Sequence, residues 1–444
     1  MASQAQAHGS SAVEKTKVAI VGLGTVGSGV ARLLVDYGDR TTRHAGRTIW
    51  LEKVVVQDPN KERDYKLPAG LLSDDLRTIT NNREISAVAH LVGGLEPARS
   101  IMVALLESGK DVVTANKALL AEHGPELFDL ARELGRSIAF EAAVAGGIPI
   151  IANISQCLSA NQIESLTAIL NGTSNYILTQ MEERGADYAG ALAEAQRLGY
   201  AEADPAMDVD GTDTAQKLAI LAHLAFGARV HWRDIPRQGI DGLEVIDIKN
   251  AQELGYRIKL LAVAELAGDG LELHVSPTLV KVGTPLAEVR GAFNAIRVVG
   301  DAVGPVFFHG LGAGRMPTAS AVVADLIDTV VGRTSITFRT LELWSQREAR
   351  VSLRDPKKIA GRFYLRLNVE DRPGVMAEIT GLLGRRGISI ASVIQREPPT
   401  EEQAVVSLVI ITHDTVESAT VSAMDEIDRL KCVRPGSVRM RILD

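Results

Sequence analysis

The chain has only two cysteines among its 444 residues, Cys157 and Cys432, so it carries no disulfide framework and no cysteine-based metal site. It has no apolar run of the ~18 residues that a membrane span needs. Its net charge of −7 argues against a general affinity for nucleic acids. The first fourteen residues are mostly small or polar and lack the apolar core of a secretory signal. We therefore expect no nucleic-acid or membrane partner, a disordered tail over 1–14, and a cytoplasmic location.

The remaining composition is that of an ordinary globular protein. Hydrophobic residues make up 46% of the chain and charged residues 23%. The length gives room for about two to four domains, each with a sizeable core.

A glycine-rich turn lies near the start of the chain. A short apolar strand, Lys17 to Val21, runs into Gly-Leu-Gly-Thr-Val-Gly, and a helix is expected from Ser28 to Tyr37. Between a strand and a helix, such glycines are typical of a dinucleotide-binding turn, although a plain strand–helix turn is the alternative. The candidate cofactor residues are Gly22, Gly24, Thr25, Val26 and Gly27.

Strands and helices continue to alternate after this turn, which favours an α/β, Rossmann-like sheet. The expected elements are strands Trp50–Gln57, Ala87–Gly94 and Asp111–Lys117 and helices Pro97–Ser108 and Pro125–Leu134. Ligands of such sheets gather at the carboxyl ends of the strands, where Asn116 and Lys117 fall. The alternative for Lys117 is a solvent-facing strand end.

The end of the second predicted strand bears on the choice of cofactor. An acid there favours the free ribose of NAD, whereas basic groups favour the 2′-phosphate of NADP. This chain has Gln57 at that position, with Lys61 and Arg63 nearby. The choice between NAD and NADP stays open, and the two basic residues favour NADP.

The most informative segment runs from Gly199 to Lys217. It places five carboxylates and one lysine around a turn that opens a strongly apolar helix. Asp213 and Lys217 are four residues apart, so on a helix they share a face and can form an ion pair. A lysine that begins an apolar run and faces several acids is a candidate proton donor. The alternative is a solvated acidic loop with an ordinary helix salt bridge.

This segment also carries a family resemblance. Gly-Tyr-Ala-Glu-Ala-Asp-Pro, followed by Asp-Val-Asp-Gly-Thr-Asp-Thr-Ala-Gln-Lys-Leu, resembles the signature of homoserine dehydrogenases. The match is long and irregularly spaced, and Thr-Ala-Asn-Lys at 114–117 also resembles the family. The resemblance implies NAD(P)H-dependent interconversion of L-aspartate-4-semialdehyde and L-homoserine. It also implies an α+β catalytic and dimerisation domain, and a homodimer or homotetramer.

The resemblance further implies roles for single residues. Lys217 would donate the proton, Lys117 would polarise the same substrate oxygen, and Asp213 would position Lys217. Glu202 and Asp208 would hold the substrate ammonium, and the turn with Thr173 would contact the amino-acid end of the substrate. Gly312, in a second glycine loop, would lie near the nicotinamide. A sodium ion would be bound by four residues, namely Glu141, Val144, Gly146 and Ile148; a plain strand-to-helix turn explains those glycines equally well.

From Arg362 onwards a separate pattern begins. It predicts strand, helix, two strands, helix and strand, with strands at Phe363–Val369, Ser389–Gln395, Ala404–Thr412 and Val438–Leu443; this order is ferredoxin-like. Glu-Asp-Arg-Pro-Gly-Val-Met-Ala-Glu-Ile resembles an ACT domain, a module that binds small amino acids. Asp371, Pro373 and Gly374 would then receive an amino-acid effector, most plausibly threonine. An inert dimerisation module is the alternative.

The predicted organisation follows from these segments. It comprises the tail 1–14, a dinucleotide-binding domain 15–149, a catalytic and dimerisation domain 150–305, a segment 306–330 that returns to the first domain, a linker 331–360 and an ACT domain 361–444. Two other functions compete: an amino-acid sensor with a degenerate nucleotide fold, and some other amino-acid dehydrogenase. The sensor predicts missing catalytic residues, yet both lysines and the acidic set are present. The specific match over 199–217 disfavours the other dehydrogenases.

Overall fold

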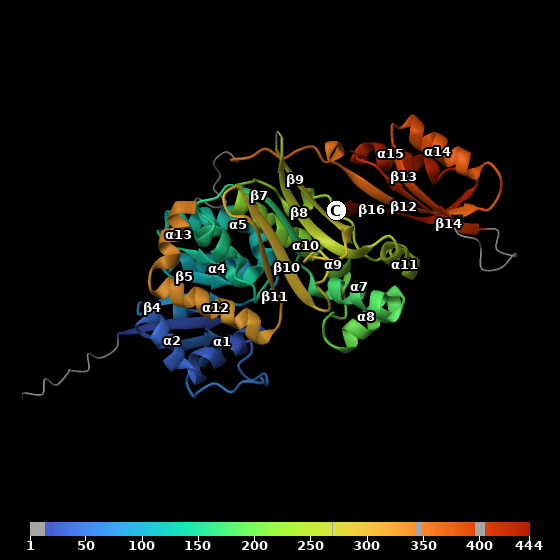
Figure 1. Cartoon of the computed structure of the whole chain (residues 1–444). Helices are drawn as coiled ribbons and strands as arrows, with labels where there is room; N and C mark the ends of the chain where they lie inside the picture. Colours follow the sequence, from blue (N-terminus) through green and yellow to red (C-terminus); the bar gives the residue numbers. More distant parts are fainter. Residues whose placement is uncertain (1–13, 269, 342–348, 396–404) are drawn as a thin grey trace, which may run out of the picture. The chain divides into compact units, whose positions relative to one another are not determined.

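The computed structural model describes residues 14–268, 270–341, 349–395 and 405–444 (Figure 1). They form two compact units: the described residues within 14–157 and 313–341, and those within 158–312 and 349–444. The predicted tail up to residue 13 and part of the predicted linker, 342–348, lie outside the described residues. No helix within the described ranges is long and apolar enough to cross a membrane.

The first unit is built on a parallel sheet with the strand order β3-β2-β1-β4-β5-β6. Its strands are β1 (Lys15–Val21), β2 (Thr48–Val55), β3 (Leu72–Ser73), β4 (Ile85–His90), β5 (Asp111–Thr114) and β6 (Ile138–Ala139). The apolar run at the end of β1 is fully buried because helices cover both faces of such a sheet. This order confirms the predicted Rossmann-like fold.

Helices of the first unit come from two distant parts of the chain. They are α1 (Thr25–Asp36), α2 (Gly38–Ala45), α3 (Arg77–Thr80), α4 (Ala98–Glu107), α5 (Lys117–Glu133), η1 (Glu141–Ala143), α6 (Ile150–Ala152), η2 (Asn153–Cys157), α12 (Arg315–Val330) and α13 (Arg333–Leu341). α12 packs on α1 at Gly29, where a Cβ atom would lie 2.8 Å from the Cβ of Ala319. The glycine therefore lets the two helices approach closely.

Three predicted boundaries in this unit are corrected. α5 begins at Lys117, not at Pro125, because the Asn116 side chain accepts a hydrogen bond from Leu119 N and caps the helix. The helix then continues through Pro125. β2 ends at Val55, so Gln57 follows the strand. α13 occupies part of the predicted linker, which is therefore partly helical.

The second unit contains one sheet with the strand order β11-β10-β7-β8-β9-β16-β12-β14-β13, and β15 pairs with β12. Its strands are β7 (Ile163–Ile169), β8 (Tyr256–Ala267), β9 (Gly270–Lys281), β10 (Phe293–Gly300), β11 (Gly304–Leu311), β12 (Ala360–Glu370), β13 (Ile390–Gln395), β14 (Val405–Thr412), β15 (Thr415–Val416) and β16 (Val433–Leu443). Parallel pairing of β16 with β9, at Arg441 with Thr278 and Leu443 with Val280, joins the C-terminal module to the preceding strands.

The helices of this unit belong to the segments that carry the site residues and to the C-terminal module. They are α7 (Gly172–Arg184), α8 (Tyr188–Arg197), α9 (Ala206–Val209), α10 (Thr212–Phe226), η3 (Trp232–Asp234), α11 (Val245–Glu253), η4 (Pro356–Lys358), α14 (Val375–Arg385) and α15 (Glu417–Ile427). The segment 306–312, predicted to return to the first domain, belongs instead to this unit, mostly as β11.

The C-terminal module has the predicted ferredoxin-like arrangement. β12, α14, β13, β14, α15 and β16 follow each other along the chain, and the strands take the order β16-β12-β14-β13. Apolar residues of β12, α14, β14 and α15 share one core, which includes Phe363, Ile379, Leu408 and Ile427. The predicted first residue of the third strand, Ala404, lies outside the described residues.

A buried ion pair ties this module to the rest of the unit. The Arg366 guanidinium of β12 donates to both carboxylate oxygens of Asp247 in α11, over 2.6 and 3.1 Å. Their side chains are only 1% and 0% exposed. The Tyr364 hydroxyl donates to Asp247 over 3.1 Å and accepts from Asn250 Nδ2 over 3.1 Å. A buried charge left without its partner is strongly destabilising, so the pair fixes α11 against β12.

Arg366→Met should destabilise the full chain by about 3–5 kcal/mol, because it leaves the buried carboxylate of Asp247 without its partner. The double variant Asp247→Leu with Arg366→Met should regain much of that loss, since neither charge remains buried. Chemical denaturation of the full chain measures both effects.

Arg434→Met is the matched control, because Arg434 pairs with Glu370 at the surface and should cost under about 1 kcal/mol. Equal destabilisation by Arg366→Met and Arg434→Met would show that the buried pair does not hold the module.

Candidate active site

The acidic segment and the helix that follows it form a compact polar cluster in the second unit. Lys217 lies one turn after Asp213 on α10, and its Nζ donates to Asp213 Oδ2 over 2.7 Å. The same Nζ donates to the backbone oxygen of Leu170 over 2.7 Å. The two side chains are 12% and 8% exposed. The predicted pair therefore exists, and it is partly buried where β7 leads into α7.

Asn171 connects this pair to a second carboxylate, and the sequence patterns did not single it out. Its Oδ1 accepts from Ser174 N over 2.7 Å and caps α7. Its Nδ2 donates to Asp208 Oδ1 over 2.8 Å and to Asp213 Oδ2 over 2.9 Å. One buried amide thus holds two acids beside the amino group of Lys217. An Asn-Gly-Thr-Ser turn after a strand is the signal that could have indicated this cap.

The polar turn at the start of α7 is tied to the acidic segment by further hydrogen bonds. The Thr173 hydroxyl donates to Tyr200 O over 2.6 Å. The Ser174 hydroxyl donates to Asp208 O over 2.7 Å. Four of the predicted site residues, Thr173, Asp208, Asp213 and Lys217, thus lie in one cluster, and their roles stay predictions. Glu202 is exposed, and its backbone oxygen accepts from Gln196 Nε2 over 3.1 Å.

Gly312 has a packing role that does not depend on a cofactor. A Cβ atom at this position would lie 2.0 Å from Asn294 Nδ2. Asn294 Nδ2 donates to Leu170 O over 3.0 Å, the same oxygen that accepts from Lys217. The glycine therefore makes room for the asparagine beside the lysine's acceptor. Its predicted position near a nicotinamide stays a prediction.

A separate groove of about 410 Å³ lies in the first unit at the carboxyl ends of β1 and β2. Four of the predicted cofactor residues line it, namely Gly22, Gly24, Thr25 and Gln57. Gly22 has φ +97°, and a Cβ atom on it would lie 2.6 Å from Leu91 O. A Cβ atom on Gly27 would lie 2.1 Å from Gly22 O. These two glycines are therefore sterically required by the turn.

Three bases and three acids line this groove. The guanidinium of Arg63 donates to the backbone oxygens of Asp58 and Lys61, each over 2.6 Å. Arg315 forms an ion pair with Asp64. Lys61 is the third base, and it faces the groove with Gln57. The charges lining the groove therefore balance, with three bases against three acids.

Asn116 and Lys117 lie where β5 gives way to α5. Asn116 Nδ2 donates to Val92 O over 2.9 Å and to Gly94 O over 2.7 Å. Together with its cap on Leu119, these bonds tie the loop after β4 to the start of α5. Lys117 is the first residue of that helix and is half-buried. Asn116 thus shapes this edge of the sheet, whichever cofactor binds there.

The predicted cation segment follows β6. The carboxylate of Glu141 accepts from the backbone N–H groups of Ile151 and Ala152, each over 2.8 Å. Burial raises the pKa of Glu141 to about 7, and burial raises the pKa of Asp325 beside it. Ala145 has φ +53°, so the Val144–Ile148 backbone turns sharply. No cluster of three or more His, Cys, Asp or Glu side chains that could hold a metal exists among the described residues. A sodium site would therefore rely on backbone carbonyls and Glu141.

The predicted effector turn lies at the start of α14. Gly374, with φ +96°, precedes the helix, and no side chain caps it. Asp371 accepts from Gln395 Nε2 over 3.2 Å. Arg372 pairs with Glu370 over 2.9 Å and Glu378 over 3.9 Å. Asp371, Pro373 and Gly374 therefore form an ordered turn beside acidic side chains, and its ligand stays a prediction.

Comparison with known proteins decides the family. Homoserine dehydrogenase sequence models match residues 149–327 and, for the NAD-binding domain, 22–141. A homoserine dehydrogenase of Pseudomonas aeruginosa is 42% identical over 433 residues, which cover 97% of this chain and 99% of that protein. This chain belongs to the homoserine dehydrogenase family. An ACT domain model matches residues 363–432, so both parts of the predicted family resemblance are confirmed.

Solved structures give the same result. A homoserine dehydrogenase from Thiobacillus denitrificans has a TM-score of 0.89 and 42% identity, with 97% of this chain and 99% of that chain covered. A hyperthermophilic archaeal homoserine dehydrogenase in complex with NADPH has a TM-score of 0.58 and 26% identity, and the match covers 71% of this chain and 97% of that one. The family and its NAD-binding domain support a nicotinamide cofactor for this chain.

Asn171→Ser should lower turnover by roughly tenfold or more, because serine still caps α7 but has no amide to hold Asp208 and Asp213. Steady-state rates of homoserine oxidation, together with the KM for the cofactor, measure the effect. The KM for the cofactor should stay nearly unchanged.

Asp187→Ser makes a comparable cap exchange at the exposed start of α8, where Asp187 accepts from Gly190 N, and should leave turnover unchanged. If both variants lower turnover alike, Asn171 acts only as a helix cap.

Proposed function

We propose that this chain interconverts L-aspartate-4-semialdehyde and L-homoserine, with Lys217 as the proton donor to the substrate oxygen. The supporting observation is the position of the Lys217 amino group, which is held between Asp213 and the Leu170 carbonyl. A bound nicotinamide cofactor supplies the hydride for reduction and accepts it in oxidation.

The hydrogen bonds of Lys217 explain how it could act on a substrate. An ammonium group has three donors, and two of them point at Asp213 Oδ2 and Leu170 O. Within the described part of the chain, the third donor is left for a substrate oxygen. Reduction of an aldehyde builds negative charge on that oxygen, and a positioned ammonium lowers the barrier by donating a proton. Asp213 restricts the direction in which the ammonium points, and Asn171 restricts Asp213.

We assign the ammonium and the carboxylate of the substrate to the other groups of the cluster. Asp208 offers a carboxylate to the substrate ammonium within the same hydrogen-bonded network. Glu202 is exposed, and its role in holding the substrate ammonium stays a prediction. The start of α7 at Thr173 presents backbone N–H groups that favour a carboxylate. Lys117 belongs to the first unit, and its role in polarising the same oxygen stays a prediction.

We propose NADP as the preferred cofactor, with NAD as the alternative. The support is Lys61, a base that lines the groove together with Gln57, the residue at the position that bears on the choice of cofactor. Arg63 and Arg315 are engaged by backbone oxygens and Asp64, so they shape the groove. The remaining predictions stand as sequence predictions: sodium at Glu141, Val144, Gly146 and Ile148, threonine as the ACT effector, a homodimer or homotetramer, and a cytoplasmic location.

The competing function is an amino-acid sensor that has kept a nucleotide-binding fold without catalysis. Its ACT domain fits that role. However, a sensor has no need for a lysine that is held by Asp213 and the Leu170 carbonyl, with Asp213 itself held by Asn171. The dehydrogenase is therefore the better supported function.

Lys217→Ala should lower turnover by roughly 100-fold or more, because it removes the proton donor. Cofactor binding should be nearly unchanged, because the groove lies in the other unit. Stopped-flow and steady-state assays with homoserine separate these two readouts. Lys281→Ala, at the exposed end of β9, is the matched control and should retain full turnover. A Lys217→Ala protein with most of the parent turnover would remove Lys217 from the mechanism.

Lys61→Met should lower kcat/KM for NADP by roughly tenfold or more, because a charge-assisted hydrogen bond to phosphate is lost. The value for NAD should change less than about twofold, since NAD lacks the 2′-phosphate. Lys66→Met is the control, because Lys66 is exposed and does not line the groove. Equal losses with the two cofactors would show that Lys61 contacts a part that they share.

A further inference from the structure

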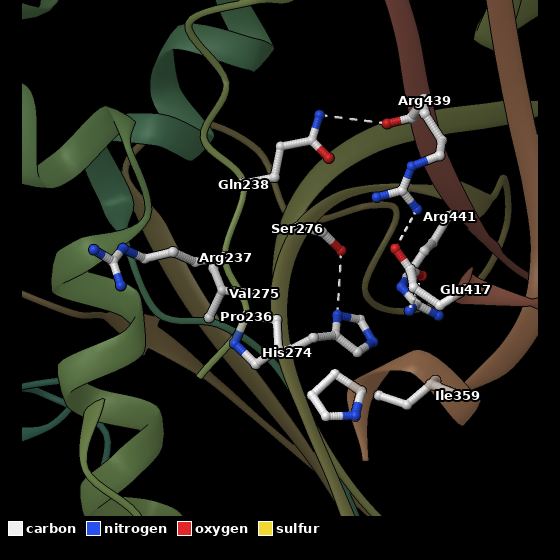
Figure 2. A pocket seen from close by; sticks show the side chains of 11 residues that line it. Pro236, Arg237, Gln238, His274, Val275, Ser276, Ile359, Glu417, Arg439 and Arg441 are labelled. Atoms are coloured by element: carbon white, nitrogen blue, oxygen red, sulfur yellow. Dashed lines mark hydrogen bonds and ion pairs between the residues drawn. The ribbon is translucent and has the colours of Figure 1, made fainter. Parts of the chain in front are cut away.

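A pocket of about 100 Å³ lies where the ACT module meets the central strand β9 (Figure 2). One wall comes from β9, with His274 and Ser276, and from the segment between η3 and α11, where Gln238 N donates to Val275 O of β9. The opposite wall comes from the C-terminal module, with Glu417 at the start of α15 and two arginines of β16. This volume admits several water molecules or a ligand of a few heavy atoms. Neither the glycine groove nor the Lys217 cluster uses these residues.

The pocket has a surplus of positive charge. Arg439 and Arg441 lie two apart on β16, so their side chains emerge on one face of the strand. Both pair with the single carboxylate of Glu417, Arg439 over 2.5 Å. Both guanidinium groups also lie over the ring of Phe363, 5.4 and 5.3 Å from its centroid. One negative charge thus faces two fixed positive charges in a partly buried space.

The other groups around the pocket do not cancel this surplus. The side chain of Arg237 points away from the pocket (Figure 2). Its guanidinium lies 5.5 Å from the centroid of the Trp232 ring. Glu272, near Arg441, is paired with Arg354. Burial lowers the pKa of His274 well below its usual range, and Arg441 and Arg439 act in the same direction. His274 is therefore neutral, and the positive charge rests on the two arginines.

Both walls also offer donors and apolar contact to a small anion. Guanidinium groups carry five N–H donors in a planar fork that matches a carboxylate or a phosphate. On the other wall, the Gln238 amide donates to Arg439 O over 3.3 Å, and the Ser276 hydroxyl lies 3.2 Å from His274 Nδ1 (Figure 2). Ile359, Pro356 and Pro236 give a short apolar lining. A ligand that bears one compact anionic group fits this combination of charge, donors and volume.

We propose that this pocket binds a small anion, a carboxylate or phosphate group, between β9 and the Arg439–Arg441 pair. The anion would touch both walls at once. It therefore binds the attached arrangement of the ACT module better than a detached one, and strengthens that attachment by mass action. The site is distinct from the predicted effector turn at Gly374, and it does not depend on the dehydrogenase reaction.

Titration of the full-length protein with inorganic phosphate and, separately, with acetate tests the proposal. Chloride keeps the ionic strength constant, and no cofactor is present. Calorimetry and thermal unfolding should show saturable binding and a saturable rise of Tm with at least one of the two anions. Binding of phosphate alone or of acetate alone assigns the chemical class. A response to neither anion, or one that never saturates, overturns the proposal.

Two variants and one control locate the site. Arg439→Gln should weaken binding by roughly tenfold or more, because it removes one guanidinium. Gln238→Glu adds a negative charge to the opposite wall without removing an arginine, and should weaken binding similarly if Arg439→Gln fails to fold. Arg434→Gln makes the same exchange on β16 outside the pocket and should bind as the parent does. Equal affinity in Gln238→Glu and Arg434→Gln overturns the assignment.

Homoserine oxidation by the same proteins separates this proposal from the proposed reaction. None of the three positions belongs to the Lys217 cluster, so basal turnover should match that of the parent. If the parent binds the anion saturably but does not oxidise homoserine, the result counts against the proposed reaction and not against the anion site.

Discussion

The buried ion pair between Asp247 and Arg366 is the constraint on which the second unit depends. Two charges taken out of water are tolerated only when each satisfies the other, and here Tyr364 and a backbone N–H complete the set. The pair crosses from α11 to β12, so the ACT module cannot leave without exposing a buried carboxylate. The module is therefore an integral part of this unit, continuous with its sheet through β16. Any effector that acts through it must work against, or with, this attachment.

The Lys217 cluster is held together differently, because its members come from elements that are close together in the sequence, from the end of β7 to α10. The end of β7 brings Leu170 and Asn171 to the start of α10, where Asp213 and Lys217 share a face. Asn171 serves as the cap of α7 and as the donor to both acids, so the backbone that ends the strand also fixes the charges. Gly312 and Asn294 support the same Leu170 carbonyl from β10 and the segment after β11. The amino group is thus oriented by one main-chain carbonyl and by one carboxylate of its own helix.

Much of the fold and of the candidate site could be predicted from local sequence patterns. Most of the features that could not be predicted depend on contacts between residues that are far apart in the sequence. A glycine turn between an apolar strand and a helix predicted the groove, and the four-residue spacing predicted the Asp213–Lys217 pair. The helix start at Lys117 was missed because Pro125 resembles a first helical residue, whereas the Asn116 cap decides the boundary. The Asp247–Arg366 pair joins residues 119 apart, and β16 joins β9 across more than 150 positions. No periodicity in one sequence marks such partners. Asn171 was missed because a turn asparagine is more often only a cap.

The pairing of β16 with β9 also has a consequence for how the protein is made. β9 has β8 on one side, and its other edge is completed near Thr278–Val280 by residues 441–443. During synthesis that edge of β9 stays unpaired until residues 441–443, more than 150 positions later, have left the ribosome. β9 is buried at nearly every position. While its edge is unpaired, this apolar strand can pair with a wrong strand of the same or another chain. The nascent chain therefore carries an exposed edge of β9 while all the residues between β9 and β16 are being made, and changes at residues 441–443 act directly on the strand that covers this edge.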